Sequence, residues 1–215
     1  MQNRSLLNTA SLDRIEQAVA DAEKSTSCEF VVVVAPASSR YEGRALRMGA
    51  AAAVLMFVAL YWINELWLYG APDALLLLLE AAAAGALTAL AFSRVSVMRR
   101  WILPRWRMQS AVQDAANAVF THENVSLTKD RNAVLLYVSV LEGEARLMPD
   151  VGVQTRLQNA AIGEISAMLA HAKSGDPTQL VCDAVRKLGQ GCVECFPVQA
   201  DDQNEMPDRP LIRMP

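Results

Sequence analysis

The stretch Met48–Ile63, MGAAAAVLMFVALYWI, contains no charged residue, and apolar residues continue through Leu66–Tyr69. A second apolar run, ALLLLLEAAAAGALTALAF at 74–92, follows the short turn GAPD at 70–73. A helix rises about 1.5 Å per residue, so about 20 apolar residues cross a hydrocarbon core of roughly 30 Å. The turn is too short to hold a domain. The sequence therefore predicts a transmembrane hairpin of two antiparallel helices over residues 48–92.

Positive charge flanks both outer ends of this hairpin: Arg40, Arg44 and Arg47 precede it, and Arg94, Arg99, Arg100, Arg105 and Arg107 follow it. The turn between the two runs carries no Lys or Arg. Loops rich in Lys and Arg stay on the cytoplasmic side of a membrane. We therefore expect a protein of the plasma (inner) membrane with two spans and with both termini in the cytoplasm.

The composition indicates a membrane anchor joined to a soluble part. The chain has 215 residues, of which 53% are hydrophobic and 20% charged, and its mean hydropathy is only +0.17. The two apolar runs account for most of the apolar excess, and the remainder has the size of one small domain. The net charge of −3 gives no argument for a nucleic-acid partner. The expected partners are the lipid bilayer and other membrane proteins, or a second copy through the hairpin.

Before the hairpin, the sequence predicts one helix and one strand. Leu12, Ile15 and Val19 recur at helical spacing after Ser11, and Cys28–Ala35 includes four consecutive valines. Such a β-branched run is typical of a strand that is covered on both faces. Because one helix cannot cover both faces, this strand requires partners from beyond the hairpin. Residues on both sides of the hairpin should therefore form one domain.

After the hairpin, apolar spacing and turn residues predict the elements in order: helix 109–120, strand 133–141, strand 144–148, helix 156–172, and a helix capped by Asp176. Beyond Pro197 the chain is acidic and rich in proline, so we expect a disordered tail. The expected fold class is α/β, a small mixed sheet flanked by helices and interrupted by the hairpin. The expected divisions are 1–47 and 93–196 for the two parts of the cytoplasmic domain, 48–92 for the hairpin and 197–215 for the tail.

Three segments carry a resemblance to a known family: LDRIEQAVADAEKSTSCEFVVVV, DRNAVLLYVSVLEGEARLMPDVGV and GDPTQLVCDAVRKLG. Together they resemble the TPM-domain family over residues 11–35 and 108–190. The chain departs from the family pattern at Asn132-Ala133, where a glycine is usual, and at Asp150-Val151-Gly152, where an aromatic–glycine pair is usual. A hairpin that splits the domain is also unlike the many members that have a signal peptide and a carboxy-terminal anchor.

The resemblance implies an accessory role in the maintenance of membrane proteins, an acid phosphatase activity, or a bound divalent metal. The residues that could serve such a site are Asp130 and Asp150 as metal ligands and Arg131 as a phosphate contact. Oxygen ligands suit calcium or magnesium. The alternative is that both aspartates are solvated turn residues and Arg131 an ordinary surface charge.

Four cysteines also require an interpretation. Cys192 and Cys195 have the C-x-x-C spacing of metal sites and redox pairs, and Cys182 precedes them on the expected last helix. A structural zinc site needs four ligands, and the chain has no second C-x-x-C. A thioredoxin-like pair should open a helix, whereas this pair follows one. We therefore interpret these thiols as incidental and the other two, Cys28 and Cys182, as small buried residues.

Glu80 is the carboxylate well inside the second apolar run. An acid within a membrane is costly and is a functional candidate by default. The small residues Ala81–Ala86 beside it favour a packing or oligomer-contact role. The leading hypothesis is thus a membrane-anchored accessory or binding protein. The alternatives are a weak metal-dependent acid phosphatase, and a small transporter or channel subunit that uses Glu80.

Overall fold

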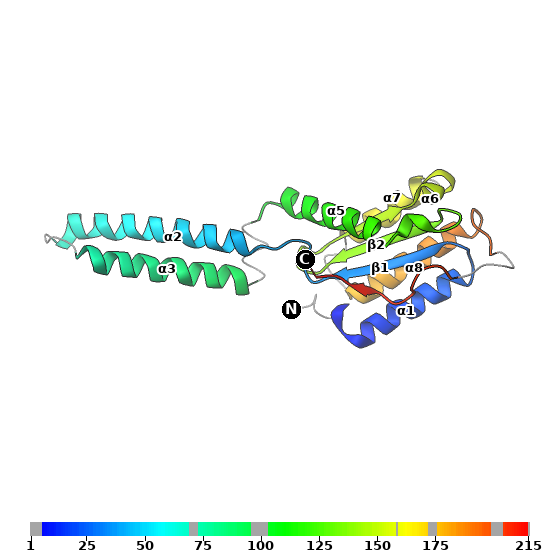
Figure 1. The fold of residues 1–215 in the computed structure, drawn as a ribbon, viewed down its shortest axis with the longest axis horizontal. Coiled ribbons are helices and arrows are strands. Elements are labelled where there is room, and N and C mark those ends of the chain that lie inside the picture. The colour runs from blue at the N-terminus through cyan, green and yellow to red at the C-terminus, as the bar shows by residue number, and fades with distance from the viewer. Residues whose placement is uncertain are drawn as a thin grey trace. The chain divides into compact units, whose positions relative to one another are not determined.

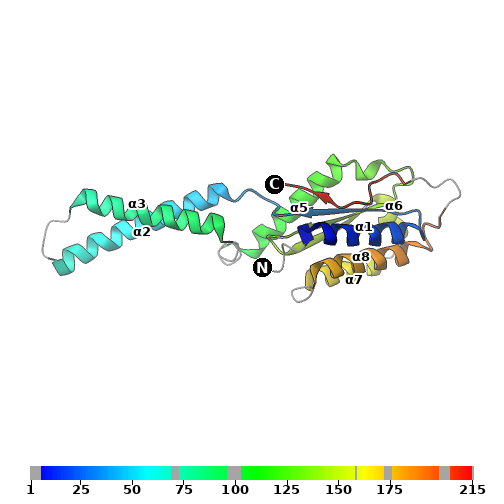
Figure 2. The ribbon, with the colours of Figure 1, turned by 90° about the horizontal axis from the view of Figure 1, so that it is seen from below.

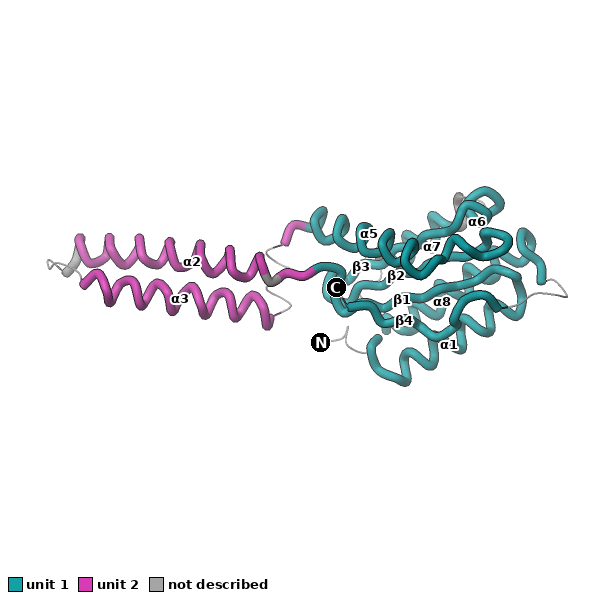
Figure 3. Tube along the Cα trace, in the orientation of Figure 1, with its two compact units in different colours: residues 1–39, 105–215 teal, residues 40–104 magenta. Residues whose placement is uncertain are grey.

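The computed structural model describes residues 6–68, 73–95, 103–157, 159–171, 176–198 and 204–214. The chain forms two compact units (Figure 3). The first unit comprises residues 1–39 and 105–215, and the second comprises residues 40–104. The second unit is thus longer at both ends than the hairpin segment expected at 48–92. Of the turn expected at 70–73, only Asp73 lies within the described residues.

The first unit contains a mixed sheet with the strand order β3-β2-β1-β4 (Figure 1). Its strands are β1 (Glu29–Ala35), β2 (Ala133–Ser139), β3 (Glu144–Pro149) and β4 (Leu211–Ile212). The central strand β1 runs parallel to β2 on one side and to β4 on the other, and β3 runs antiparallel to β2. The predicted mixed α/β sheet is confirmed.

Helices cover both faces of this sheet (Figure 2). They are α1 (Thr9–Glu23), α5 (Arg105–His122), α6 (Val151–Arg156), α7 (Asn159–His171) and α8 (Pro177–Cys192). Alternate strand residues point to opposite faces. Phe30, Val32 and Val34 therefore pack with α1, α7 and α8, whereas Val31 and Val33 pack with α5. All seven residues of β1 are buried, as expected for a valine run covered on both faces.

The C-terminal segment, residues 204–214, corrects the prediction of a disordered tail. Its two-residue strand β4 pairs with Val33 and Val34 of β1. The carboxylate of Glu29 accepts hydrogen bonds from the backbone nitrogens of Glu205 and Met206, each at 3.2 Å. Composition alone suggested disorder, but the segment occupies the free edge of the central strand and gains backbone partners there.

The second unit consists of α2 (Glu42–Ile63), the π-helical turn η2 (Asn64–Leu68) and α3 (Ala74–Arg94). Two helices of this unit are long and apolar enough to cross a membrane, Gly43–Leu66 and Ala74–Arg94. They approach each other closely at two glycines. A Cβ atom built on Gly49 would lie 2.7 Å from the carbonyl oxygen of Gly85, and one built on Gly85 would lie equally close to that of Gly49.

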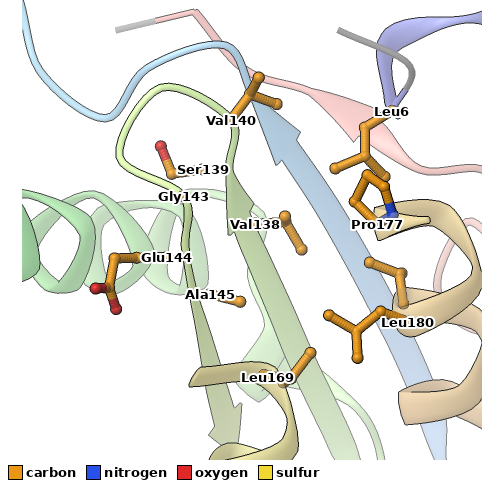
Figure 4. A pocket seen from close by; sticks show the side chains of 11 residues that line it. Leu6, Val138, Ser139, Val140, Gly143, Glu144, Ala145, Leu169, Pro177 and Leu180 are labelled. Atoms are coloured by element: carbon orange, nitrogen blue, oxygen red, sulfur yellow. The ribbon is translucent and has the colours of Figure 1, made fainter. Parts of the chain in front are cut away.

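A small apolar cavity of about 50 Å³ lies beside β2, on the face covered by α1 and α8 (Figure 4). Leu6, Leu169 and Leu180 reach toward Val138 across it. A volume of this size is far below the roughly 300–1,000 Å³ that is typical of small-molecule sites. Leu6, which precedes α1, is 2% exposed. We assign no ligand to this cavity.

Candidate functional site

The edge of the sheet where β2 begins holds the residues predicted from the family resemblance. Asp150 follows β3 and is 2% exposed. Its Oδ1 accepts hydrogen bonds from the backbone nitrogen of Val151, at 2.7 Å, and from Nη2 of Arg131, at 3.1 Å. Its Oδ2 lies 2.8 Å from Nε of Arg131. The structure therefore brings Arg131 and Asp150 together as an ion pair that also caps the start of α6.

Asp130 is exposed on the turn that leads into β2. At Arg131 the chain adopts a left-handed conformation, with φ of 54°. Gly152 packs directly against this turn, because an added Cβ would lie 2.4 Å from the carbonyl oxygen of Arg131 and 2.8 Å from that of Asp130. No group of three or more His, Cys, Asp or Glu side chains placed to hold a metal occurs in the described part of the chain. The calcium or magnesium site at Asp130 and Asp150 stays a prediction.

The carboxyl ends of β1 and β2 lie at the opposite edge of the sheet. Ligands of α/β sheets usually bind there, whereas Asp130 and Asp150 lie at the amino ends of the parallel strands. A chain of polar side chains occupies this edge. The hydroxyl of Ser38 lies 3.2 Å from that of Tyr137 and 2.9 Å from that of Ser139, and Ser139 donates to Oε2 of Glu142. The backbone nitrogen of Ser38 also donates to the Glu142 carboxylate, at 3.1 and 3.3 Å.

The direction of these hydrogen bonds follows from the carboxylate at their end, because a carboxylate only accepts. Ser139 donates its one proton to Glu142, so Ser38 donates to Ser139. The remaining bond must then run from the hydroxyl of Tyr137 to that of Ser38. Burial raises the pKa of Tyr137, with a smaller contribution from Glu142, so the phenol keeps this proton at neutral pH. The result is an ordered relay from Tyr137 to Glu142 that holds residue 38 against the β2–β3 turn.

A pocket of about 270 Å³ opens beside Ser38 and Tyr137. Its other walls come from α5 and the C-terminal segment, and they are Ala115, Ala118, Val119, His122, Arg213 and Met214. Nη2 of Arg213 contacts Nδ1 of His122 at 2.8 Å and also pairs with Glu123. The pocket therefore combines an apolar wall with a guanidinium, an imidazole and two hydroxyls.

Sequence reasoning missed this group of residues. Ser38 follows β1 and Ser139 is the last residue of β2. The rule for carboxyl strand ends could have identified both. Arg213 was assigned to a disordered tail and could not be connected with them. His122 has no partner residue nearby in the sequence that would indicate a site.

The hairpin residue Glu80 is exposed on α3 in the isolated chain. Thr88, on the same helix, donates its hydroxyl to the carbonyl oxygen of Ala84, at 2.8 Å. The small residues Ala81 and Gly85 are buried within the unit. Close packing at these residues thus occurs between α2 and α3, while a contact of Glu80 with a second chain stays a prediction.

All four cysteines are free thiols. Cys28 and Cys182 are buried, as expected from sequence. A hydrogen bond with Cys192 and burial raise the pKa of Cys28, and burial raises the pKa of Cys182. The carbonyl oxygen of Cys192 accepts from the backbone nitrogens of Cys195 and Phe196, at 3.1 and 2.8 Å. The C-x-x-C segment therefore closes the end of α8, which gives it a structural role.

No protein-family model matches the sequence, and no curated protein shows a significant match. The fold is similar to the NMR structure of the BA42 protein from the psychrophilic bacterium Bizionia argentinensis. The TM-score is 0.55 and the sequence identity 18%, and the match covers 96% of this chain and 94% of that chain. At this identity the likeness shows the fold alone.

Proposed function

We propose that this chain is a membrane-anchored accessory protein, in which a TPM-like α/β domain binds other membrane proteins at the cytoplasmic face of the plasma (inner) membrane. The observation that carries the proposal is the insertion of an apolar helical hairpin between β1 and α5. The binding domain is thereby attached to its anchor at two points of the chain. Membership of the TPM family is part of the proposal and is supported by the three quoted segments.

The hairpin has the length and surface of a bilayer-spanning element. Helices of 24 and 21 residues extend about 36 and 31 Å, close to the roughly 30 Å of a hydrocarbon core. Large apolar side chains point outward along both helices, with Leu55 71% exposed and Leu87 67% exposed. Water-soluble surfaces rarely carry so large a contiguous apolar area. Lipid is the solvent that suits these side chains.

Charge supports the proposed orientation. Three arginines, Arg40, Arg44 and Arg47, precede the uncharged stretch of α2 that begins at Met48. A fourth, Arg94, is the last residue of α3. The guanidinium of Arg44 lies 5.2 Å from the ring centre of Tyr41, an arrangement that suits an interfacial position. Because cationic flanks stay cytoplasmic, both ends of the hairpin belong on that side.

Fractionation of cell membranes tests the anchor. Replacing Leu79 and Leu87 by arginine places two charges in the second helix, each costing about 2.5–3.5 kcal/mol near the centre of a bilayer. We expect the wild-type chain to resist alkaline extraction and this double variant to leave the membrane fraction. Leu127→Arg is the matched control, because Leu127 is 73% exposed in the first unit. Wild-type protein in the soluble fraction would contradict the anchor.

Native gels of gently solubilised membranes test the accessory role. We expect the wild-type chain to migrate with other membrane proteins, in a complex larger than its own oligomer. The control variant Leu127→Arg should migrate in the same complex. Migration of the wild type only as a monomer or a homo-oligomer would contradict this role. Conversion of a homo-oligomer to a monomer by Glu80→Leu would instead assign the hairpin to self-association.

A further inference from the structure

We propose that the pocket between α5, the carboxyl end of β2 and the C-terminal segment binds a small organic anion that carries one apolar group. This inference concerns a site in the first unit and stands independently of the membrane anchor. The volume of the pocket, about 270 Å³, lies just below the range of about 300–1,000 Å³ that is typical of small-molecule sites. The occupant must therefore be small.

The anionic group is assigned to Arg213 and His122. Nη2 of Arg213 makes both contacts, to His122 and to Glu123. Within the described residues, Nη1 and Nε of Arg213 have no hydrogen-bond partner. Their N–H groups point to different sides of the guanidinium, so each can donate a single hydrogen bond to a carboxylate or phosphate oxygen. Because Arg213 donates to Nδ1 of His122, the proton of the neutral imidazole is on Nε2. The histidine therefore presents a second donor to the ligand.

Among the residues that the structure describes, the two carboxylates next to the pocket, Glu123 and Glu142, are already engaged. Glu123 pairs with Nη2 of Arg213 and does not line the pocket. Glu142 accepts from Ser139 and from the backbone nitrogen of Ser38. The hydroxyl protons of Tyr137 and Ser38 are committed to the relay that ends at Glu142. The remaining strong donors that face the pocket are thus the guanidinium and the imidazole.

The apolar group is assigned to the wall formed by α5. Ala118 and Val119 supply this wall, and Met214 adds a flexible apolar side chain from the C-terminal segment. Methionine adapts to ligands of irregular shape. The small side chains of Ala115 and Ala118 leave room for a ring or a short chain. An apolar wall next to two cationic or donor groups selects an anion with a hydrophobic body rather than a bare ion.

Titration calorimetry of the full-length protein in detergent tests the site with three probes. Benzoate has both groups, benzyl alcohol lacks the charge, and inorganic phosphate lacks the apolar body. We expect benzoate to bind with one-to-one stoichiometry and each of the others to bind about tenfold more weakly or worse. Equal affinity for benzyl alcohol or for phosphate, or no binding of benzoate, would overturn the proposal.

Substitutions locate the binding. Arg213→Gln should weaken benzoate binding by about tenfold or more, since a charged hydrogen-bonding group is lost. Arg209→Gln is the matched control in the same segment, because Arg209 pairs with Asp13 and Glu16 away from the pocket. Ala118→Leu keeps a good helix former, fills the pocket and should also weaken binding. Equal effects of the two arginine changes, or no effect of Ala118→Leu, would overturn the assignment.

Measurements in bilayers distinguish two possible anionic ligands of the pocket, a free metabolite and a lipid headgroup. In phosphatidylcholine vesicles benzoate should bind as it does in detergent. The comparison is made at an ionic strength that screens the negative surface potential of phosphatidylglycerol vesicles, because this potential alone repels benzoate. Weaker binding in these vesicles would then identify competition by an anionic lipid, and unchanged binding would identify a soluble ligand. Loss of benzoate binding in both kinds of vesicle would contradict a site that operates in the membrane-bound protein.

Discussion

Replacing Asp150 by asparagine separates a structural role of this carboxylate from a metal-binding role. Asparagine keeps one side-chain oxygen, so it can still cap α6 through the nitrogen of Val151. It loses the charge and one of the two oxygens that meet Arg131. Hydrogen bonds to charged groups contribute about 1.5–3 kcal/mol, and the half-exposed Arg131 side chain lowers this value through solvent screening. We therefore expect a loss of about 1–2 kcal/mol.

Thermal unfolding in detergent, followed by circular dichroism, measures this loss. For a unit of this size, 1 kcal/mol shifts the midpoint by roughly 2–4 °C, so the expected decrease is roughly 2–8 °C. Asp130→Asn is the control and should leave the midpoint unchanged, because Asp130 is exposed. If Asp150 has a structural role alone, neither result depends on added calcium or magnesium. A rise of the wild-type midpoint with either ion that both variants abolish would refute the structural role and establish the predicted metal site.

Three further predictions test other parts of the first unit. Gly152→Ala should lower the free energy of unfolding by about 2 kcal/mol or more in urea titrations, because the new Cβ meets the backbone carbonyl oxygens of Asp130 and Arg131. An unchanged free energy of unfolding would show that the turn at these two residues moves freely. Glu29→Gln should speed hydrogen exchange at the amides of Glu205 and Met206 by about tenfold, and unchanged protection would refute this anchoring contact. Iodoacetamide at pH 8 should label the partly exposed Cys195 first, because burial and raised pKa values keep thiols such as Cys28 neutral; equal labelling would contradict this.

The main elements of the fold could be predicted from local patterns. The valine run indicated a strand covered on both faces, and Asp176-Pro177 marked the start of α8, where Asp176 accepts from the nitrogen of Thr178 at 3.0 Å. The short helix α6 was missed, because Val151–Arg156 has too few residues for a periodic pattern. Strand β4 was missed for a different reason: its two residues gain stability only from their pairing with β1.

The candidate sites could also be predicted only in part, because they depend on contacts between residues that are far apart in sequence. Arg131 and Asp150 were selected from the resemblance, and the structure shows that they pair with each other. The pocket at the other edge joins Ser38, His122 and Arg213, which are far apart in sequence and individually uninformative. A site of this kind depends on topology, because the parallel pairing of β1 with β2 and β4 decides which loops meet.

The position of the hairpin in the sequence also determines when the sheet can assemble during synthesis. Glu29 of β1 pairs with Ala133 of β2, a separation of 133 − 29 = 104 residues. At about 5–20 residues per second, a ribosome needs roughly 5–20 s to add that segment. During this interval a strand with four consecutive valines has left the ribosome without its neighbour. If the hairpin inserts into the bilayer as we propose, this strand waits for β2 next to the membrane.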